Sequence, residues 1–248
     1  MSAKPQVQDT SHASVKVQSE KADQVQAMFT SIAGRYDFLN SVLSFGVDKI
    51  WRNEAVQLAK SFKPGAILDV ATGTADLAIA LKKSLPEATV TGVDFAEKML
   101  EYGREKAANQ ALEIPLLQGD GQNLAFDDNQ FDLLTIAYGI RNFSDRKRGL
   151  NEFHRVLKPG GKLMVLEFPP PTKDLFGRLF SAYFLGLSPY IAGFISGERD
   201  AYRYLGESVL NFPRPDVFAG QINDAGFVNI RYKLQLFGIS AIHVGEKP

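Results

Sequence analysis

The chain has 248 residues, 45% of them hydrophobic, which is enough to bury a sizeable core, and one compact domain with additions is expected. Lysine plus arginine and aspartate plus glutamate number 28 each, so no overall basic field exists to bind nucleic acid. The absence of cysteine excludes disulfides and cysteine zinc sites and is typical of a reducing, cytoplasmic location, and three histidines without ligand spacing predict no metal.

The first twenty residues are polar, and we expect them to form a disordered tail (1–20). They contain no apolar stretch of the kind found in a signal peptide. Two helical patterns follow, at about Lys21–Ala33 and Asp48–Ser61, on either side of the segment Tyr36–Gly46. Both are expected to pack before the first strand of a single domain (21–248).

The run Ala66–Ala80 combines an apolar strand that ends in an acid, a turn of small residues and the start of a helix. Such a loop is typical of sites that cradle an adenosine-containing cofactor. Small side chains let the main chain approach the ligand, and the amides that open the next helix favour a polar or anionic group. Asp69 closes the strand, at the edge where open α/β sheets bind ligands.

The same loop argues against a nicotinamide dehydrogenase. A dinucleotide fingerprint reads G-x-G-x-x-G, whereas this loop has Ala71, Gly73 and Asp76 at the glycine positions. A second apolar strand, Ala88–Val93, ends in Asp94, 21 residues after Gly73, where an acid suits the two hydroxyls of a ribose. Taken alone, each acid could equally be a capping residue in an ordinary strand-to-helix turn.

Three further strands are predicted downstream, with a turn at Leu157–Gly161 before the last: Ile114–Leu117, Phe131–Ala137 and Lys162–Phe168. Strands that alternate with helices at this pace predict a parallel, doubly wound α/β sheet. A proline-rich break then leads into an aromatic helical region, which we interpret as a lid inserted at about 172–211. Two extended runs around Gly238 are expected to form an antiparallel hairpin.

The pattern resembles the class I S-adenosylmethionine (SAM) methyltransferases, whose Rossmann-like sheet has seven strands, mostly parallel, with a C-terminal antiparallel hairpin. The resemblance implies SAM as the cofactor and assigns Asp69 and the Gly73 loop to its methionine moiety and Asp94 to its ribose. Asp120 and Gly121 are assigned to the adenine edge, where a carboxylate can accept from the exocyclic amine. The implied cofactor-binding residues are Asp69, Gly73, Thr74, Asp94, Phe95, Asp120, Gly121 and Ala137.

Two segments, Tyr36–Trp51 and Arg155–Phe168, narrow the range of possible methyl acceptors. Together they resemble the paired signatures of the quinone C-methyltransferases of menaquinone and ubiquinone biosynthesis. Tyr36–Trp51 is the more specific, because K-P-G-G before a strand is common among methyltransferases. Further matches, which extend the resemblance from about Ala27 to the end of the chain, are Ala137–Asn142, Ala201–Ser208 and Asp224–Phe227.

This resemblance implies methylation of a ring carbon on a demethylated, prenylated quinol, with demethylmenaquinol as the expected acceptor. The carbon becomes nucleophilic when the adjacent hydroxyl loses its proton, which phenols do at about pH 10. Arg141, just past the fourth strand, is expected to stabilise the oxyanion, although it does not itself accept a proton. The residues expected to orient the ring oxygens or to stack on the quinol are Tyr36, Asn40, Tyr138 and Asn142.

The chain departs from the family at two positions. Leu39 stands where the family usually has methionine, which is a mild change of apolar shape. Asp48 stands where the family often has histidine or another basic or amide residue. Two interpretations of Asp48 stay open: contact with the quinol, or a cap for the helix that runs to Ser61.

The segment Leu175–Ile195 supports a lipophilic acceptor. It is about as long as a membrane span, but Arg178, Pro189 and several glycines argue against spanning. The open interpretations are a tunnel for an isoprenoid chain, a helix in the membrane interface and ordinary core helices over the active site. Peripheral membrane contact and a homo-oligomer are both compatible with the sequence.

Several conspicuous residues have structural explanations. We interpret His154 as structural or solvated, Trp51 as a packing anchor and Arg146–Arg148 as a solvated helix start. Tyr202 and Tyr204 cannot share one helical face, so at most one is expected to face the pocket. The other functions left open are methylation of a ubiquinone or phylloquinone precursor, a sterol-like molecule or a plain phenol, and a non-catalytic SAM-binding scaffold.

Overall fold

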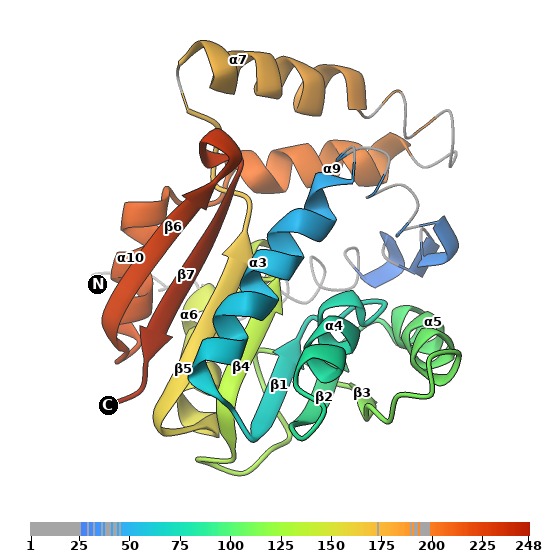
Figure 1. The fold of residues 1–248 in the computed structure, drawn as a ribbon. Coiled ribbons are helices and arrows are strands. Elements are labelled where there is room, and N and C mark those ends of the chain that lie inside the picture. The colour runs from blue at the N-terminus through green and yellow to red at the C-terminus, as the bar shows by residue number, and fades with distance from the viewer. Residues whose placement is uncertain are drawn as a thin grey trace, which may run out of the picture.

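The computed structural model describes residues 26–28, 30, 31, 33–35, 37, 41, 44, 46–172, 174–188, 190, 193 and 199–248. A seven-stranded sheet runs through it in the order β3-β2-β1-β4-β5-β7-β6, with helices on both faces (Figure 1). The predicted tail and most of the first predicted helix lie outside the described residues, which include a helical stretch at 26–28 and the 3-10 helix η1 (Ala33–Arg35).

The strand order and directions confirm the predicted sheet. The five parallel strands are β1 (Ala66–Val70), β2 (Thr89–Asp94), β3 (Leu116–Gln118), β4 (Phe131–Ala137) and β5 (Leu157–Glu167). The antiparallel hairpin consists of β6 (Val228–Gln235) and β7 (Ser240–Glu246), and β7 is also antiparallel to β5. β5 begins before the predicted Lys162, because Leu157 already pairs with Phe131 ahead of a shift in register.

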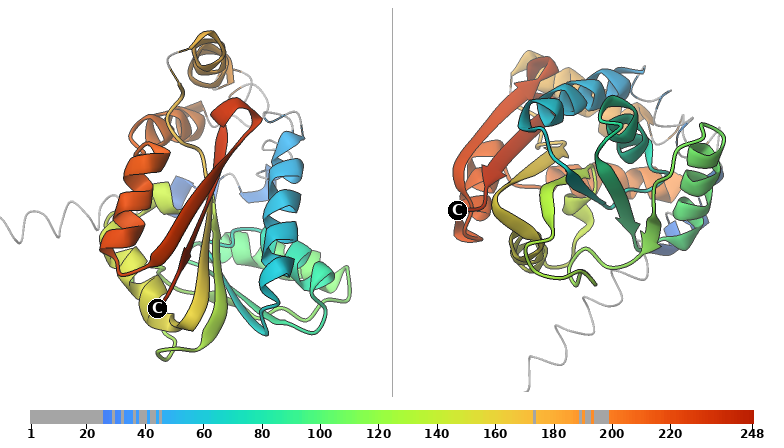
Figure 2. Two further views of the ribbon diagram at one scale, coloured as in Figure 1. Left: turned by 60° about the vertical axis from the view of Figure 1, so that its left-hand side comes forward. Right: turned by 60° about the horizontal axis from the view of Figure 1, so that its bottom comes forward.

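Two helix layers cover the sheet, as Figure 2 shows from two further directions. One layer consists of α3 (Val47–Phe62), α4 (Asp76–Ser84) and α5 (Glu97–Ala108). The other contains α6 (Arg146–Val156) and α10 (Pro215–Asp224). Successive strand residues face opposite layers, so Ile67 is buried in the core beneath α3 and α4, and Leu68 in the core beneath α6 and α10.

A third group of helices lies beyond the carboxyl ends of the parallel strands. It consists of α7 (Leu175–Ser181), the π-helix η3 (Ala182–Leu187) and α9 (Arg199–Leu210), which fall in the part predicted as a helical lid (Figure 1). The first turn of α3 faces the same end of the molecule. Among the helices that the structure describes, none combines the length and the apolar character needed to cross a membrane.

Candidate functional site

The loop after β1 is a tight turn built on small residues. Ala71, Gly73 and Ala75 all have positive φ, at 52°, 56° and 64°, and α4 begins directly afterwards at Asp76. Left-handed backbone is least costly for residues with little or no side chain. The residues predicted to let the main chain approach a ligand therefore also form the turn itself.

Asp94 ends β2 and holds this loop in place. Its Oδ2 accepts a hydrogen bond from the Gly73 amide at 2.8 Å, and its Oδ1 accepts one from the Ala96 amide at 2.9 Å. Burial raises the pKa of Asp94 to about 6. Each carboxylate oxygen has a second lone pair, so Asp94 keeps the capacity to accept from hydroxyl groups of a ligand.

Asp69 supports the same loop from the neighbouring strand. Its two oxygens accept hydrogen bonds from the hydroxyls of Thr72 and Thr135, each at 2.6 Å. Burial raises the pKa of Asp69 to about 6. Through these hydrogen bonds the Asp69 carboxylate orders the turn, and when ionised it contributes negative charge to the site.

A cleft runs along the carboxyl ends of β1, β2 and β4, and we call it the strand-end cleft. Asp94 and Asp120 both line it, as does Gln26, whose Nε2 donates to the Phe95 carbonyl at 2.8 Å. Sequence reasoning missed Gln26, Met99 and Phe143 in its wall. Six of the eight residues predicted for the cofactor line this cleft: Gly73, Asp94, Phe95, Asp120, Gly121 and Ala137.

The strand-end cleft combines acidic side chains with closely packed glycine. At Gly121 a Cβ atom would lie 2.6 Å from Cζ of Phe143 and 2.7 Å from Cγ1 of Val70, so the packing of these two side chains requires glycine at this position. Asp94 and Asp120 both line the cleft, and carboxylates can accept hydrogen bonds from hydroxyl groups or from an amine. The other two predicted cofactor residues, Asp69 and Thr74, line the neighbouring cavity.

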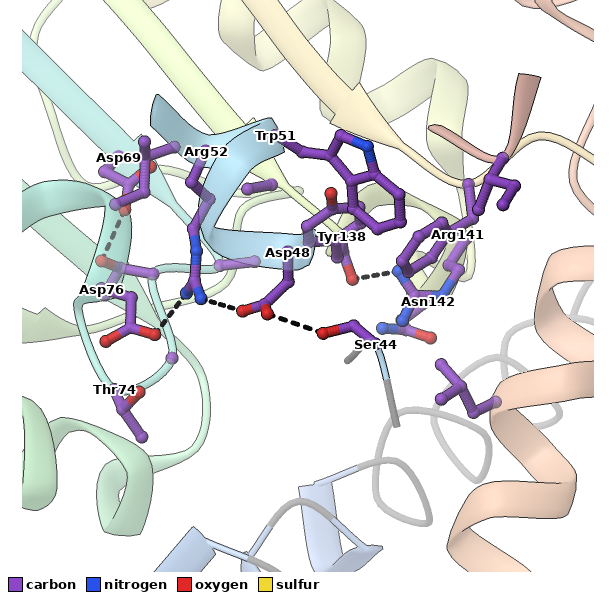
Figure 3. Close-up of a pocket in the computed structure, with 18 of the residues that line it drawn as sticks. Ser44, Asp48, Trp51, Arg52, Asp69, Thr74, Asp76, Tyr138, Arg141 and Asn142 are labelled. Atoms are coloured by element: carbon purple, nitrogen blue, oxygen red, sulfur yellow. Dashed lines mark hydrogen bonds and ion pairs between the residues drawn. The ribbon is translucent and has the colours of Figure 1, made fainter. Parts of the chain in front are cut away.

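That neighbouring cavity, which we call the aromatic cavity, is enclosed by α3, the start of α4, α7, η3 and α9 (Figure 3). Its apolar side is a series of packed rings. Phe168 stacks on Tyr138 at 4.3 Å between ring centroids, meets Trp51 edge-on at 5.7 Å and lies 6.1 Å from Phe184. Phe184 in turn stacks on Phe180 at 5.2 Å.

The aromatic cavity also contains a group of charged side chains. The Arg52 guanidinium pairs with both Asp48 and Asp76, and Ser44 Oγ donates to Asp48 Oδ1 at 2.6 Å (Figure 3). Lys106 also pairs with Asp76, so Asp76 faces two cations. Gly46 caps α3 without any side-chain hydrogen bond, so the interpretation of Asp48 as a helix cap is wrong. Sequence reasoning also missed Arg52.

Arg141 lies in the wall of the aromatic cavity, as its position after β4 suggested. Its side chain is buried, with Nη1 2.8 Å from Glu167 Oε1 and Nε donating to Ser208 Oγ at 3.3 Å, and it also donates to the Tyr138 carbonyl. Burial raises the pKa of Glu167, and the nearby Arg141 opposes that shift. The guanidinium is therefore held rigidly, and its charge is balanced.

The two cavities share a wall. At this shared wall the loops after β1 and β4 are in close contact, because a Cβ atom on Gly139 would lie only 2.5 Å from Cβ of Ala71. Tyr138 has a φ of 58°, an uncommon value for an aromatic residue. The residues that line both cavities are Ala71, Gly73, Ala137, Tyr138 and Asn142. The two cavities are therefore adjacent.

The remaining predicted residues fall in different places. Tyr36 and Asn40 lie outside the described residues, as does the side chain of Tyr202. Tyr204 lines the aromatic cavity and donates to Asn142 Oδ1 at 3.3 Å. His154 lies on α6 and packs edge-on against the Phe227 ring. It lines neither cavity, in agreement with a structural role.

Two structural interpretations need adjustment. Trp51 is only 5% exposed and packs in the core beneath α3, yet it also lines the aromatic cavity. Arg146 is not simply solvated, because its guanidinium lies 5.7 Å from the Phe212 ring. Lys147 and Arg148 are exposed, as expected of a helix start.

Comparison with solved structures agrees with this fold. A SAM-dependent methyltransferase from Thermotoga maritima aligns with a TM-score of 0.63 at 20% identity, covering 90% of this chain and 99% of that one. A SAM-dependent methyltransferase from Aquifex aeolicus aligns with a TM-score of 0.53 at 19% identity, covering 77% and 88%. Both share the class I methyltransferase architecture.

Sequence comparison is more specific. The chain is 51% identical over 221 residues to the demethylmenaquinone methyltransferase of Thermus thermophilus, covering 89% of this chain and all of the relative. It is 44% identical to the ubiquinone/menaquinone biosynthesis C-methyltransferase UbiE of Geobacter sulfurreducens, covering 92% and 90%. The model of the ubiE/COQ5 methyltransferase family matches residues 15–247. This chain is therefore a SAM-dependent methyltransferase that belongs to the ubiE/COQ5 methyltransferase family.

Proposed function

We propose that this chain transfers the methyl group of SAM to a ring carbon of a demethylated, prenylated quinol, with demethylmenaquinol as the acceptor. The observation that carries the proposal is the aromatic cavity, which shares lining residues with the strand-end cleft and combines charged side chains with packed aromatic rings. A quinol with a prenyl chain has the same combination of polar and apolar parts. The names of the relatives point to the same acceptor.

The strand-end cleft would hold the adenosine of SAM, with Asp94 at the ribose and Asp120 with Gly121 at the adenine edge. Asp69, Gly73 and Thr74 would surround the methionine end, near the shared wall. SAM supplies a methyl group already activated as a sulfonium. The protein then has to orient the acceptor carbon in line with that methyl and exclude water.

Arg141 would stabilise the phenolate form of the acceptor. Its ion pair with Glu167 and its hydrogen bond to Ser208 fix the guanidinium before the acceptor binds, so little reorganisation is needed when charge develops. Asn142 and Tyr138, on the shared wall, would orient the ring between the polar and aromatic sides. Tyr36 and Asn40, from the family signature, would complete the polar side.

The prenyl chain would leave the cavity past Phe180 and Phe184, beneath α7. We further propose that this end of the molecule touches the membrane in which such a substrate dissolves. Large apolar side chains are exposed there: Leu175 is 74% exposed, Leu179 62%, and Phe237 at the β6–β7 turn 76%. α7 and that turn lie at the same end of the molecule (Figure 1).

Label transfer from methyl-tritiated SAM to a panel of chemically reduced acceptors tests the proposed function. We expect demethylmenaquinol to accept label, and to do so better than ubiquinone precursors, plain phenols or sterols. Label that appears only in one of the other acceptors would identify that acceptor as the substrate in place of demethylmenaquinol. SAM binding with no S-adenosylhomocysteine formed from any acceptor would favour the scaffold alternative.

Vesicle sedimentation tests the membrane contact. Replacing Leu175 and Leu179 together by serine should weaken binding to phosphatidylglycerol vesicles several-fold, since each exposed leucine contributes apolar area to the interface. Val217→Ser is the matched control, because Val217 is 48% exposed but lies on α10, in the helix layer that contains α6, and not beside α7. Equal binding by all three proteins would leave α7 as a cover for the cavity alone.

A further inference from the structure

Methylation of a quinol carbon requires a proton acceptor, and the proposed role of Arg141 does not supply one. An arginine guanidinium stays protonated in proteins, so it can stabilise a phenolate but cannot generate it. The inference below rests on the proposed function and names the group that takes the hydroxyl proton. The aromatic cavity offers three carboxylates in its lining, Asp48, Asp69 and Asp76.

The hydrogen bonds of these three carboxylates differ. Both oxygens of Asp69 accept from threonine hydroxyls, and Asp76 is paired with two cations, Arg52 and Lys106. Among the residues that the structure describes, each oxygen of Asp48 has one partner: Oδ2 pairs with a single cation, Arg52, and Oδ1 accepts from Ser44, a hydroxyl of the same segment. Asp48 is 6% exposed, on the first turn of α3. From this geometry we infer that Asp48 is the general base that removes the proton from the acceptor hydroxyl.

The step balances without any further reactant. The O–H bond of the quinol breaks, the proton moves to Asp48, and the oxygen electrons reach the ring carbon, which forms a bond to the methyl group. The S–CH₃ bond breaks with its electron pair left on sulfur. The ring carbon then loses its own hydrogen as a proton to solvent while the oxygen recovers the proton from Asp48, which restores the aromatic quinol.

The surroundings of Asp48 suit this exchange. The transfer moves one negative charge from Asp48 to the acceptor oxygen, so no net charge is created in the buried cavity. Arg52 is paired with Asp48 before the transfer and lies beside the new oxyanion after it (Figure 3). Ser44 fixes the orientation of the carboxylate through its 2.6 Å hydrogen bond. Arg52 and Ser44 are thus positioning residues, and Asp48 is the catalytic one.

Single-turnover rates of Asp48→Asn across pH, at saturating SAM, test the inference. We expect a rate about 100- to 1000-fold below wild type at pH 7, in the range of a lost general base. The variant rate should rise about tenfold per pH unit towards the ionisation of the acceptor at about pH 10. SAM affinity by calorimetry should match wild type. Asp76→Asn, which removes the other partner of Arg52, is the control and should keep the wild-type shape of the pH profile.

The outcomes distinguish a catalytic role of Asp48 as general base from a purely structural role in its ion pair with Arg52. A wild-type rate for Asp48→Asn at pH 7 overturns the inference, as do equal losses with the same pH profile in Asp48→Asn and Asp76→Asn. Should Asp48→Asn fail to fold, Asp48→His decides, because a histidine base introduces an inflection at about pH 6.5 and a structural residue does not. If the wild-type protein methylates a plain naphthol but no quinol, the proposed acceptor is wrong. The role of Asp48 can then still be tested by measuring the same variants with naphthol as the acceptor.

Discussion

The strand-end cleft and the aromatic cavity lie side by side but are built in different ways. The strand-end cleft is made largely of loops that follow strands, where main-chain turns and acids such as Asp94 sit close to their strand in sequence. The aromatic cavity shares the loops after β1 and β4 and adds side chains from α3, α7, η3, α9 and Phe168, which are far apart in the chain. Local sequence therefore determines the first, and long-range packing assembles the second.

This difference predicts that the two ligands can be affected separately. Substitutions in strand-end loops should act on SAM affinity, and substitutions in the aromatic cavity should act on transfer or on acceptor choice. The shared wall is the place where both should change together. The following predictions test that separation.

The largest effect is expected at Arg141. Arg141→Ala should lower the rate constant of methyl transfer by about 100- to 1000-fold while SAM still binds, because one oxyanion donor is typically worth that much. Raising the pH should partly rescue the variant, since more acceptor arrives ionised. Single-turnover kinetics and calorimetry measure the two quantities. A variant impaired only through lost SAM affinity would break the separation between the two cavities.

The buried ion pair adds a control to this experiment. Arg141→Ala leaves Glu167 buried without its cation, which destabilises the fold as well as the site. Arg141→Lys keeps the charge but not the planar fork, so it should fold better and rescue transfer only if charge alone matters. Thermal melts of both variants separate loss of folding from loss of catalysis.

A loss of similar size is expected for SAM binding at Asp94. Asp94→Ala removes the acceptor for the ribose hydroxyls and leaves the Gly73 amide without its partner, at a cost of about 2 to 4 kcal/mol in binding free energy. Calorimetry should show the weaker affinity. At SAM concentrations that saturate the variant, the transfer rate constant should stay near wild type. Wild-type SAM affinity would instead remove Asp94 from the ribose site.

A smaller and more selective effect is expected at Phe184, which is 9% exposed and packs between Phe168 and Phe180. Phe184→Ser should lower turnover of long-prenyl acceptors about tenfold more than that of short ones, since it removes apolar surface from the proposed chain path. Leu185, its neighbour, has a side chain outside the described residues. Phe126→Ser, which disrupts a ring pair with Phe131 in the other core, controls for general destabilisation. Equal losses of turnover for long and short acceptors would favour the interpretation of this segment as ordinary core helices over the active site.

The smallest effect concerns the charge of the strand-end cleft without SAM. The pKa of Asp94 is about 6 in the folded protein against an ordinary value of 3.8. A carboxyl with a raised pKa stabilises the fold at low pH, and this contribution is lost as the pH rises through about 6. Between pH 5 and pH 7 the loss should amount to about 1 kcal/mol. Urea unfolding at both pH values should show a loss of stability between pH 5 and pH 7 that is larger in wild type than in Asp94→Asn by about this amount.

Other titrating groups do not obscure that comparison. Burial lowers the pKa of His243, so its contribution to stability is present at neutral pH and is lost as the pH falls below its usual value. That trend opposes the one from Asp94 but is common to wild type and variant. Asp69 titrates in both proteins, since burial raises its pKa to about 6, and the charge of Asp94 adds to that shift in wild type alone. Identical pH dependence in the two proteins would contradict the burial argument for Asp94.

The sequence predicted the sheet because its strands are marked locally. β4 was predicted with both of its ends correct, and the hairpin around Gly238 was recognised from its two extended runs. α10 was missed, although Pro215 at its start and the spacing of Phe218 and Ile222 are helical signals. The early start of β5 was missed because pairing of Leu157 with Phe131 is a long-range feature.

The candidate site divides in the same way. The strand-end acids and glycines could be identified from strand–turn–helix patterns and the family resemblance. Arg52 had one local signal, its i,i+4 spacing from Asp48, but its pairing with Asp76, which lies 24 residues away on a different helix, is not marked in the sequence. The partners of Arg141 were equally hidden, since Glu167 belongs to the neighbouring strand and Ser208 to α9. Spacing in the sequence carries no information about such pairs.

The wall common to both cavities has a thermodynamic consequence. Ala71 and Tyr138, both with positive φ, border the two cavities at once, so a ligand that shifts them in one cavity alters the free energy of binding in the other. Such cooperativity is reciprocal: the factor by which the acceptor changes the affinity for SAM equals the factor by which SAM changes the affinity for the acceptor.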